Sequence, residues 1–261
     1  MIVSFDLKAD GAMFKKPDVN EGLYLSYNTL HKPALLGILG AVLGLGGFEA
    51  SKAFPEYYQK LSQLQVSIAP IGDRSDKGNF TKFTVQYNNG VGYASQEQGG
   101  NLIVKEQTLF RPGYRCYVQV DPSDPMQQRL AEALQKGEAV YPPYLGKNEF
   151  PAWWENVQVW EEEAFGGDRE FFLQSLFVKQ GRLQDEVARP KFSFRTLGNN
   201  PLSERFLFFE RLPLRYDPTL RQYQLAEFAY TNQLLEADSA LSNLYELSSA
   251  QSEETPIIQL Y

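Results

Sequence analysis

The sequence predicts an α+β protein with a ferredoxin-like (RRM-like) βαββαβ domain, an inserted β-hairpin and a small β-rich C-terminal region. Two observations lead to this fold class. Runs of alternating polar and apolar residues indicate strands, whereas one long apolar run spaced by glycines indicates a buried helix. Along the chain these segments follow one another as strand–helix–strand, hairpin, strand–helix–strand, which is the order of a ferredoxin-like domain.

The first strand and the first helix have the strongest patterns. Residues 2–8 alternate as a strand, and a loop over residues 10–31 follows. Pro33 suits the first turn of a helix, and the leucine-rich residues after it leave almost no polar face, so this helix must be buried. Its glycines lie three and four residues apart and allow a neighbouring element to approach closely: Gly37, Gly40 and Gly44.

A short second helix is expected over residues 54–64 and a second strand over residues 64–70. Residues 80–110 predict a long β-hairpin, because two β-prone runs, FTKFTVQY and NLIVKEQTLF, flank a linker rich in Asn and Gly. The linker is too long for a tight turn. A hairpin of this kind either hooks an extended ligand or packs on its own sheet, and the residues leave both interpretations open.

The second half of the domain repeats the order strand, helix, strand. Residues 114–120, YRCYVQV, predict a third strand in which the Cys116 thiol is buried. A helix is expected over residues 126–136, with N-caps in the preceding DPSDP turn, and a fourth strand over residues 157–165. Between them lies a compact aromatic loop, residues 141–152.

Three regions are therefore expected. Residues 1–166 form the ferredoxin-like domain, with its inserted β-hairpin at about 78–112. Residues 167–221 form a small β-rich region, because short aromatic-rich runs such as RFLFFERLPLRY replace the earlier pattern. Residues 222–261 are expected to hold a helical stretch near residues 226–247 and a polar, acidic tail.

Charge and composition exclude several classes of protein. The net charge of −7 argues against a generic nucleic-acid binder, although the acid is concentrated after residue 221, where the chain has no Lys or Arg. One cysteine and one histidine allow neither a disulfide within the chain nor a Cys/His zinc site, and we expect no metal and no cofactor. With neither a signal peptide nor a convincing membrane span, the protein is expected to be cytoplasmic, without membrane contact.

The residues that precede the buried helix predict an anion or phosphate site. A helix N-terminus offers unpaired N–H groups and a partial positive charge. Cationic and aromatic residues gather in the loop before it: Phe14, Lys15, Lys16, Tyr24, Tyr27, His31 and Lys32. The alternative is that these are solvated surface residues beside a helix that is buried without any function. His31, assisted by Tyr24, Tyr27 or Lys32, is also the one candidate for general acid–base catalysis.

Two stretches resemble the signatures of a known family. The run FKKPDVNEGLYLSY followed by HKPALLGILGAVLGL resembles the N-terminal signature of the Cas-five family, the CRISPR-associated RAMP-superfamily subunits of type I Cascade complexes. The loop YPPYLGKNEFPA resembles the second signature of that family, about a hundred residues later and in the expected order. The resemblance covers roughly residues 1–165 and suggests a type I-B-like system.

The resemblance implies an RNA-binding role in antiviral defence. Members of the family consist of a palm with a hairpin thumb, bind the 5′ handle of the CRISPR RNA (crRNA) and cap the backbone filament. The partners implied are crRNA, the Cascade backbone and large subunits, and target DNA within the complex. The RNA-binding residues expected on this basis are Phe14, Lys15, Lys16, Tyr24, Tyr27, His31, Lys32, Lys82, Lys105 and Arg111.

The sequence departs from the branch of the family that cuts precursor RNA. That branch, type I-C, uses a Tyr/Lys/His constellation, whereas here the single histidine, His31, lies in the N-terminal signature and none follows a lysine after the thumb. The leading hypothesis is therefore a non-catalytic crRNA-binding subunit. The alternatives are a metal-independent endoribonuclease and a protein-interaction module, the latter favoured by the acidic charge.

Overall fold

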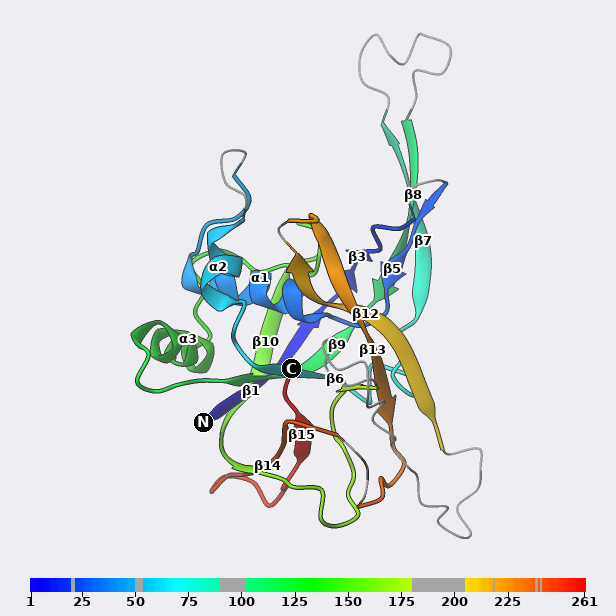
Figure 1. Ribbon diagram of the computed structural model, residues 1–261. Helices are drawn as coiled ribbons and strands as arrows, with labels where there is room; N and C mark the ends of the chain where they lie inside the picture. Colours follow the sequence, from blue (N-terminus) through cyan, green and yellow to red (C-terminus); the bar gives the residue numbers. More distant parts are fainter. Residues whose placement is uncertain are drawn as a thin grey trace.

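The computed structural model describes residues 1–19, 22–49, 54–89, 102–179, 205–217, 219–237, 239 and 241–261. One antiparallel sheet forms the centre of the protein, in the strand order β15-β14-β10-β1-β9-β6 (Figure 1). The strands of this sheet that lie before residue 166, and the three helices, have the following bounds: β1 (Ile2–Ala9), α1 (Lys32–Leu43), α2 (Glu56–Leu61), β6 (Val66–Pro70), β9 (Gly113–Gln119), α3 (Pro125–Lys136) and β10 (Ala152–Ala164). All seven of these elements lie within or close to the ranges that the sequence predicts.

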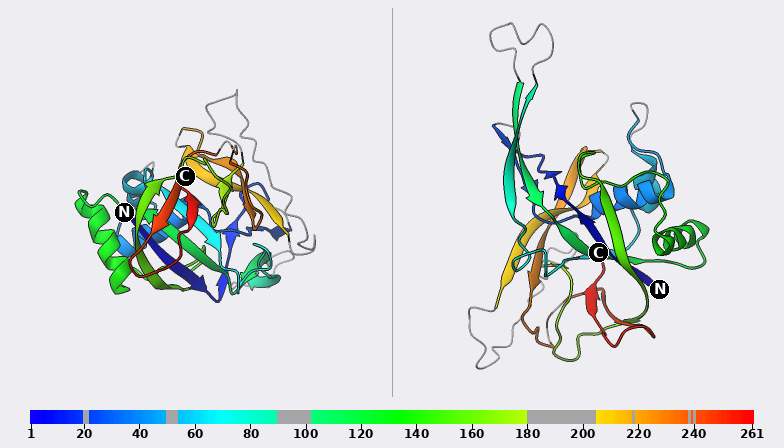
Figure 2. Two further views of the ribbon diagram at one scale, coloured as in Figure 1. Left: turned by 90° about the horizontal axis from the view of Figure 1, so that it is seen from below. Right: turned by 180° about the vertical axis from the view of Figure 1, so that it is seen from behind.

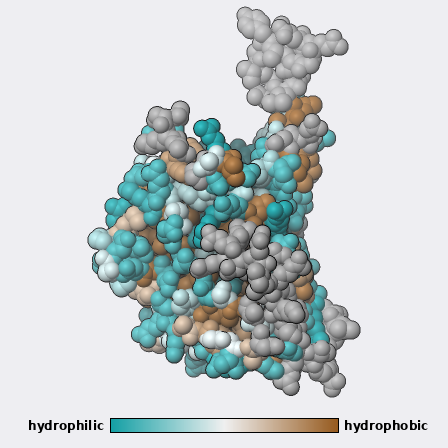
Figure 3. All heavy atoms as spheres, viewed as in Figure 1, coloured by the Kyte–Doolittle hydropathy of each residue, from teal (hydrophilic) through white to brown (hydrophobic). Residues whose placement is uncertain are grey.

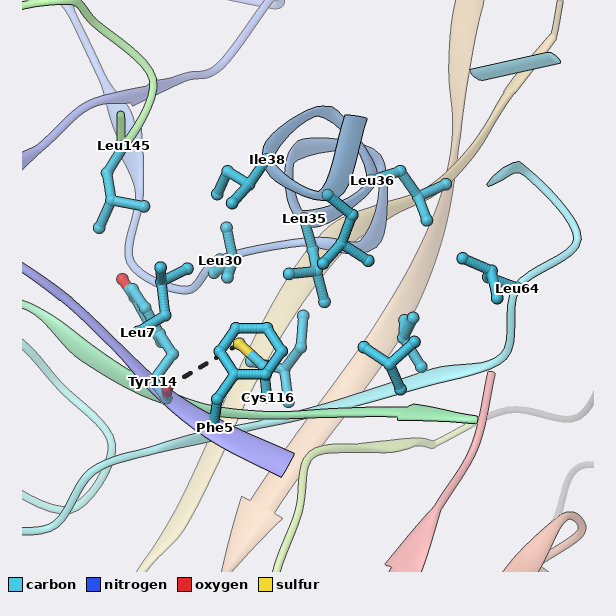
Figure 4. Packing of buried hydrophobic residues seen from close by; sticks show 14 of the residues in the cluster. Phe5, Leu7, Leu30, Leu35, Leu36, Ile38, Leu64, Tyr114, Cys116 and Leu145 are labelled. Carbon is cyan, nitrogen blue, oxygen red and sulfur yellow. Dashed lines mark hydrogen bonds between the residues drawn. The ribbon is translucent and has the colours of Figure 1, made fainter. Parts of the chain in front are cut away.

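Helix α1 is the most deeply buried helix and packs between the sheet and α2. Nine of its twelve residues are buried. Leu35, Leu36 and Ile38 lie over the apolar side chains of β1 and β9, among which the Cys116 thiol is fully buried, as expected (Figure 4). The burial of these side chains is the main source of stability for this half of the protein.

The glycines of α1 allow the close approach that the sequence predicts. A Cβ atom on Gly40 would lie 2.4 Å from the Cβ of Tyr57 in α2, so no other residue fits there without moving that helix. Gly44 ends α1 in the left-handed conformation, with a φ of 74°, and packs against Val140.

Residues 10–31 differ from the expected loop, because four short strands order them: β2 (Gly11–Ala12), β3 (Phe14–Lys15), β4 (Leu23–Tyr24) and β5 (Ser26–Tyr27). Strand β2 pairs with β8 in antiparallel fashion and β4 pairs with β8 in parallel, while β3 pairs with β5. Two-residue strands are too short to leave a periodic pattern in the sequence. They form because β8 supplies hydrogen-bonding partners to β2 and β4, while β3 and β5 supply them to each other.

The predicted hairpin is present as β7 (Lys82–Asn89) and β8 (Leu102–Phe110), which pair over their whole length. It projects from the body of the protein (Figures 1 and 2). The linker at its tip, residues 90–101, lies outside the described residues. Apolar side chains are exposed on the hairpin within a largely hydrophilic surface, namely Phe83, Ile103 and Phe110 (Figure 3).

The helix expected near residues 226–247 is wrong, and the polar, acidic stretch expected after it ends in a buried strand. The described residues form strands instead: β13 (Gln222–Thr231) lies between β11 (Phe177–Val178) and β12 (Leu207–Asp217), and β14 (Leu244–Ser248) and β15 (Ile257–Gln259) extend the central sheet. The run YQLAEFAYT alternates with a period of two residues, and pairing with β12 favours a strand over the helix-forming content of the segment. Residues 180–204 of the expected β-rich region lie outside the described residues.

The end of the chain closes the sheet. Backbone hydrogen bonds join Tyr261 and Val66 in both directions, at 3.0 and 3.2 Å, so the segment after β15 meets the opposite edge strand, β6. Leu247, Ile258 and Leu260 pack on Ile2, Tyr117 and Trp160 and cover the face of the sheet that the helices leave open.

Candidate nucleic-acid interface

The two sequence signatures, more than a hundred residues apart, are in direct contact. The backbone N–H of Met13, the residue just before the first signature, donates to the carbonyl of Leu145 in the second, over 3.2 Å. Gly146 has a φ of 84°, and a Cβ atom there would lie 2.0 Å from the carbonyl oxygen of Met13. Only glycine permits this contact, which holds the aromatic loop against the N-terminal strands.

A cavity of about 760 Å³ lies between these signatures and runs along α1. Its polar end lies near the start of α1, because Phe14, beside Lys15, contacts the ring of His31 at that end of the helix. Its aromatic end lies near the last turn of α1, where the backbone N–H of Tyr141 donates to Ala41 over 3.0 Å. The large aromatic residues that line it are Phe14, Phe48, Tyr57, Tyr141, Tyr144 and Tyr223.

Lys15 lies at the polar end of the cavity. Its ammonium group lies 3.8 Å from the centre of the Tyr24 ring, and no acidic partner is present among the described residues. Tyr24 is held beside Glu106 by the pairing of β4 with β8. Glu106 in turn accepts a hydrogen bond of 2.5 Å from Lys147 of the aromatic loop. This group joins both signatures to the base of the hairpin.

Lys16 faces a second group of cations, because successive residues of an extended chain point to opposite sides. Its ammonium lies 3.9 Å from the Glu210 carboxylate and 5.1 Å from the centre of the Tyr27 ring. Partial burial and the nearby Lys16 lower the pKa of Lys82, whereas Glu210 raises it. Burial, Asp18 and Glu210 raise the pKa of Tyr27 to about 12, and Arg211 acts in the opposite direction.

Glu210 ties β12 to the loop before α1. It accepts hydrogen bonds from the backbone N–H groups of Asn28, at 2.8 Å, and Thr29, at 3.0 Å. Burial raises the pKa of this carboxyl group, and the hydrogen bonds and Lys16 oppose that shift. Glu210 therefore places one negative charge among Lys16, Lys82 and Arg211.

His31 is the N-cap of α1 and is only 7% exposed. Its Nδ1 accepts a hydrogen bond from the backbone N–H of Ala34, at 3.3 Å, and the rings of Phe14, Tyr27 and Tyr223 surround it. Burial lowers the pKa of His31 to about 3, so its imidazole is neutral at neutral pH. The anion site expected at this helix end has fewer free backbone donors than a helix start usually offers, because Pro33 has no N–H and that of Ala34 is already bonded.

Lys32 is also buried and donates from Nζ to the backbone oxygen of Tyr261, at 3.0 Å. Burial, assisted by Arg215, lowers its pKa to about 8. Four residues that were expected to face RNA are thus buried inside the protein, beneath the surface that carries Lys15 and Lys16: Phe14, Tyr27, His31 and Lys32. The other expected residues remain accessible, fully or in part: Lys15, Lys16, Tyr24, Lys82, Lys105 and Arg111.

Several residues of this surface were not expected from the sequence. Lys147 lies in the second signature, but its pairing with Glu106 depends on how that loop packs. Arg211 belongs to the alternating Arg and aromatic run of β12, which was the one signal that could have identified it. Within the described ranges, no group of three His, Cys, Asp or Glu side chains could hold a metal ion. None of the described helices is long and apolar enough to cross a membrane.

No family model matches the sequence, and no curated protein matches it. Solved structures do. A chain of the Type III-B Cmr-beta bound to cognate target RNA and AMPPnP aligns at 10% identity over 98% of this chain and 99% of its own, with a TM-score of 0.51. A CRISPR protein from Archaeoglobus fulgidus aligns at 10% identity over 98% of both chains, with a TM-score of 0.49.

A chain of a CRISPR RNA-guided surveillance complex aligns at 13% identity over 89% of this chain and 91% of its own, with a TM-score of 0.46. Of these three likenesses, the one to the Cmr-beta chain has the highest TM-score and supports a shared fold over nearly the full length of both chains. At 10% identity it shows the fold alone: this chain has the fold of that chain of the Type III-B Cmr-beta.

Proposed function

We propose that this protein is an RNA-binding subunit of a CRISPR RNA-guided surveillance complex. In this role it holds the 5′ handle of crRNA, caps one end of the backbone of a type I Cascade in antiviral defence, and does not cut RNA. One observation carries the proposal: the two signature sequences converge on a single cationic and aromatic surface, formed by Lys15, Tyr24 and Lys147, at the base of a projecting hairpin.

The order of the strands supports the proposed architecture. The four central strands run β10-β1-β9-β6, with α1 between β1 and β6 and α3 between β9 and β10. We interpret this as the ferredoxin-like RAMP domain, with the β7–β8 hairpin as its thumb. The similar Cmr-beta chain comes from an assembly bound to target RNA, which makes crRNA, other Cas subunits and target nucleic acid the partners to test.

The side chains of the surface suit a single RNA strand. Proteins hold such strands by aromatic stacking and by cations on the phosphates. Exposed cations lie on both sides of the hairpin base and along the hairpin: Lys15, Lys82, Lys105, Arg111 and Arg211. The acidic C-terminal strands do not cancel these charges, because Glu227 pairs with Lys179 at 3.2 Å and Glu246 pairs with Arg169 at 2.6 Å.

The geometry of His31 supports a binding role over a nuclease. A general acid or base works best with a pKa near the working pH. Burial instead lowers the pKa of His31 to about 3, and its Nδ1 is bonded to the backbone of α1. The imidazole therefore has a structural role as a helix cap.

The first test is binding of a labelled repeat RNA in EDTA, resolved on native and denaturing gels. We expect a shifted complex with intact RNA. Lys15→Ala is expected to weaken binding about tenfold and to reduce the salt slope by about 0.7, the value for one phosphate contact on a single strand. Lys136→Ala is the matched control, because this exposed lysine lies on α3, away from the hairpin (Figure 1).

Two results would contradict the proposal. Wild-type protein that neither shifts nor protects the handle would exclude handle binding by the isolated chain. Cleavage of the RNA at one position would indicate a metal-independent endoribonuclease, and loss of that cleavage in His31→Ala would identify the residue responsible.

A further inference from the structure

We propose that the cavity along α1 holds a single splayed-out base of the bound RNA strand, with the adjoining phosphate at Lys15. This inference rests on the proposed function, because it names the part of the strand that the cavity would take. A volume of about 760 Å³ falls within the usual range for sites that bind small molecules.

The floor of the cavity is smooth. Only three residues of α1 are not buried, Ala34, Gly37 and Ala41, and all three line the cavity. They lie on one face of the helix, because they are three, four and seven residues apart. None carries a side chain larger than a methyl group, so a planar group can lie close to the helix.

The walls offer uncovered aromatic rings. Phe48, Tyr141 and Tyr144 line the cavity and are 73%, 54% and 45% exposed. Large aromatic side chains seldom remain so exposed at one place unless the surface binds something. A nucleobase matches them, since every base has an apolar face for stacking and a polar edge for the tyrosine hydroxyl groups.

The polar end carries the charge for one phosphodiester. Lys147 is neutralised by Glu106, at 2.5 Å, whereas Lys15 has no acidic partner among the described residues. One unpaired ammonium group complements the single negative charge of one nucleotide within a strand. A free nucleoside triphosphate would bring several negative charges and would need more cations than this end provides.

The test uses handle RNA in which 2-aminopurine replaces one base at a time, because stacking on an aromatic ring quenches its fluorescence. We expect binding to quench one position far more strongly than its neighbours. Ala41→Leu fills the cavity from its floor and is expected to abolish this quenching while reducing overall affinity by less than about tenfold, since the cations outside the cavity remain.

Lys136→Leu is the control for the added leucine, because this exposed helical position of α3 lies outside the cavity. It should keep the quenching. Tyr144→Ala removes a wall without filling the cavity, so it tests the inference even if Ala41→Leu does not fold. Its control is Phe172→Ala, an exposed aromatic residue outside the cavity.

The outcomes separate this inference from the proposed function. RNA binding with no selectively quenched position, or quenching that persists in both Ala41→Leu and Tyr144→Ala, would overturn the base pocket and leave handle binding intact. Failure of the wild-type protein to shift any handle RNA on a native gel would overturn the proposed function and this inference with it.

Discussion

At the scale of single residues, burial divides the cationic and aromatic residues of the N-terminal signature into those that support the fold and those that form the surface. His31 and Lys32 are next to each other in the chain, yet both are turned into the protein, one as a helix cap and the other as a donor to Tyr261. Lys15 and Lys16 stay accessible on opposite sides of the chain. The sequence shows which residue types are present. Their roles depend on whether each side chain points into the protein or toward solvent.

His31 yields a prediction about stability and pH. Its pKa is about 3 in the folded protein and near 6.5 in the unfolded chain, so the unfolded chain binds more protons between these values. Stability is fully present above pH 6.5 and declines as the pH falls toward 3. His31→Asn, which can still cap the helix, is expected to flatten this part of the curve, measured by urea unfolding at successive pH values.

The matched variant His31→Ala removes the cap and should lower the free energy of unfolding by about 0.5–2 kcal/mol near pH 7. RNA affinity should change little in His31→Asn. A large loss of affinity with unchanged stability would show that the imidazole contacts RNA directly.

At the scale of elements, glycines set how closely segments pack. Helix α1 approaches α2 at Gly40, and the aromatic loop approaches Met13, between β2 and β3, at Gly146. Both contacts hold the walls of the cavity, since Tyr57 and Tyr144 belong to the packed segments. The spacing of the glycines in α1 predicted a close neighbour, but not which element it would be.

Gly37 and Gly40 offer a paired test of this packing. Alanine favours a helix over glycine by about 1 kcal/mol, which alone would stabilise both variants. At Gly40 the new Cβ would lie 2.4 Å from Tyr57, so Gly40→Ala is expected to destabilise by about 1–3 kcal/mol. Gly37→Ala should be neutral or stabilising. Equal thermal midpoints for the two variants would contradict this account of the helix contact.

A helix or strand could be predicted when the residues of its own segment carried a periodic pattern or turn residues. Strand β1, helix α1 and the β7–β8 hairpin follow from periodicity and turn residues in their own segments. Strands β2 to β5 are too short for such a pattern and exist through pairing with one another and with β8. The helix expected near residues 226–247 was wrong because Ala, Leu and Glu favour helices, whereas pairing with β12 determined the strand.

The candidate site was predictable only in outline. The sequence indicated a cationic and aromatic surface near the start of α1, and Lys15, Tyr24 and Lys82 lie there. The partnership of Lys147 with Glu106 and the place of Arg211 beside Tyr27 depend on contacts between distant segments. Periodicity carries no information on such contacts, because it reports only which face of an element is buried.

At the scale of the whole molecule, a net charge of −7 coexists with a cationic region because the charges are segregated. The residues after 221 include six acidic and no basic side chains, so they account for most of the net negative charge, and Glu227 and Glu246 among them form ion pairs. Glu210 lies elsewhere, because its carboxylate is among the cations beside the hairpin. The distribution of charge over the surface is therefore a better guide to the binding partner than the net charge of the protein.

Glu210→Gln tests this balance. Removal of this negative charge near Lys16 and Lys82 is expected to strengthen RNA binding severalfold at low salt and to steepen its salt dependence. The control is Glu163→Gln, an exposed carboxylate on β10. Isothermal titrations at several salt concentrations give both quantities, and equal affinities for the two variants would count against Lys16 and Lys82 as RNA contacts.

The closed central sheet has a consequence for how the protein folds. Strand β1 pairs with residues 113–119 and 152–160, and Val66 bonds to Tyr261, so the central contacts join distant parts of the chain. At about 5–20 residues per second, the first strand waits roughly ten to thirty seconds on the ribosome for β10. During that interval the apolar helix α1 has no complete sheet to cover it. Contacts between residues so far apart in the sequence also form slowly. The newly made chain is therefore expected to depend on chaperones until its last strands have been synthesised.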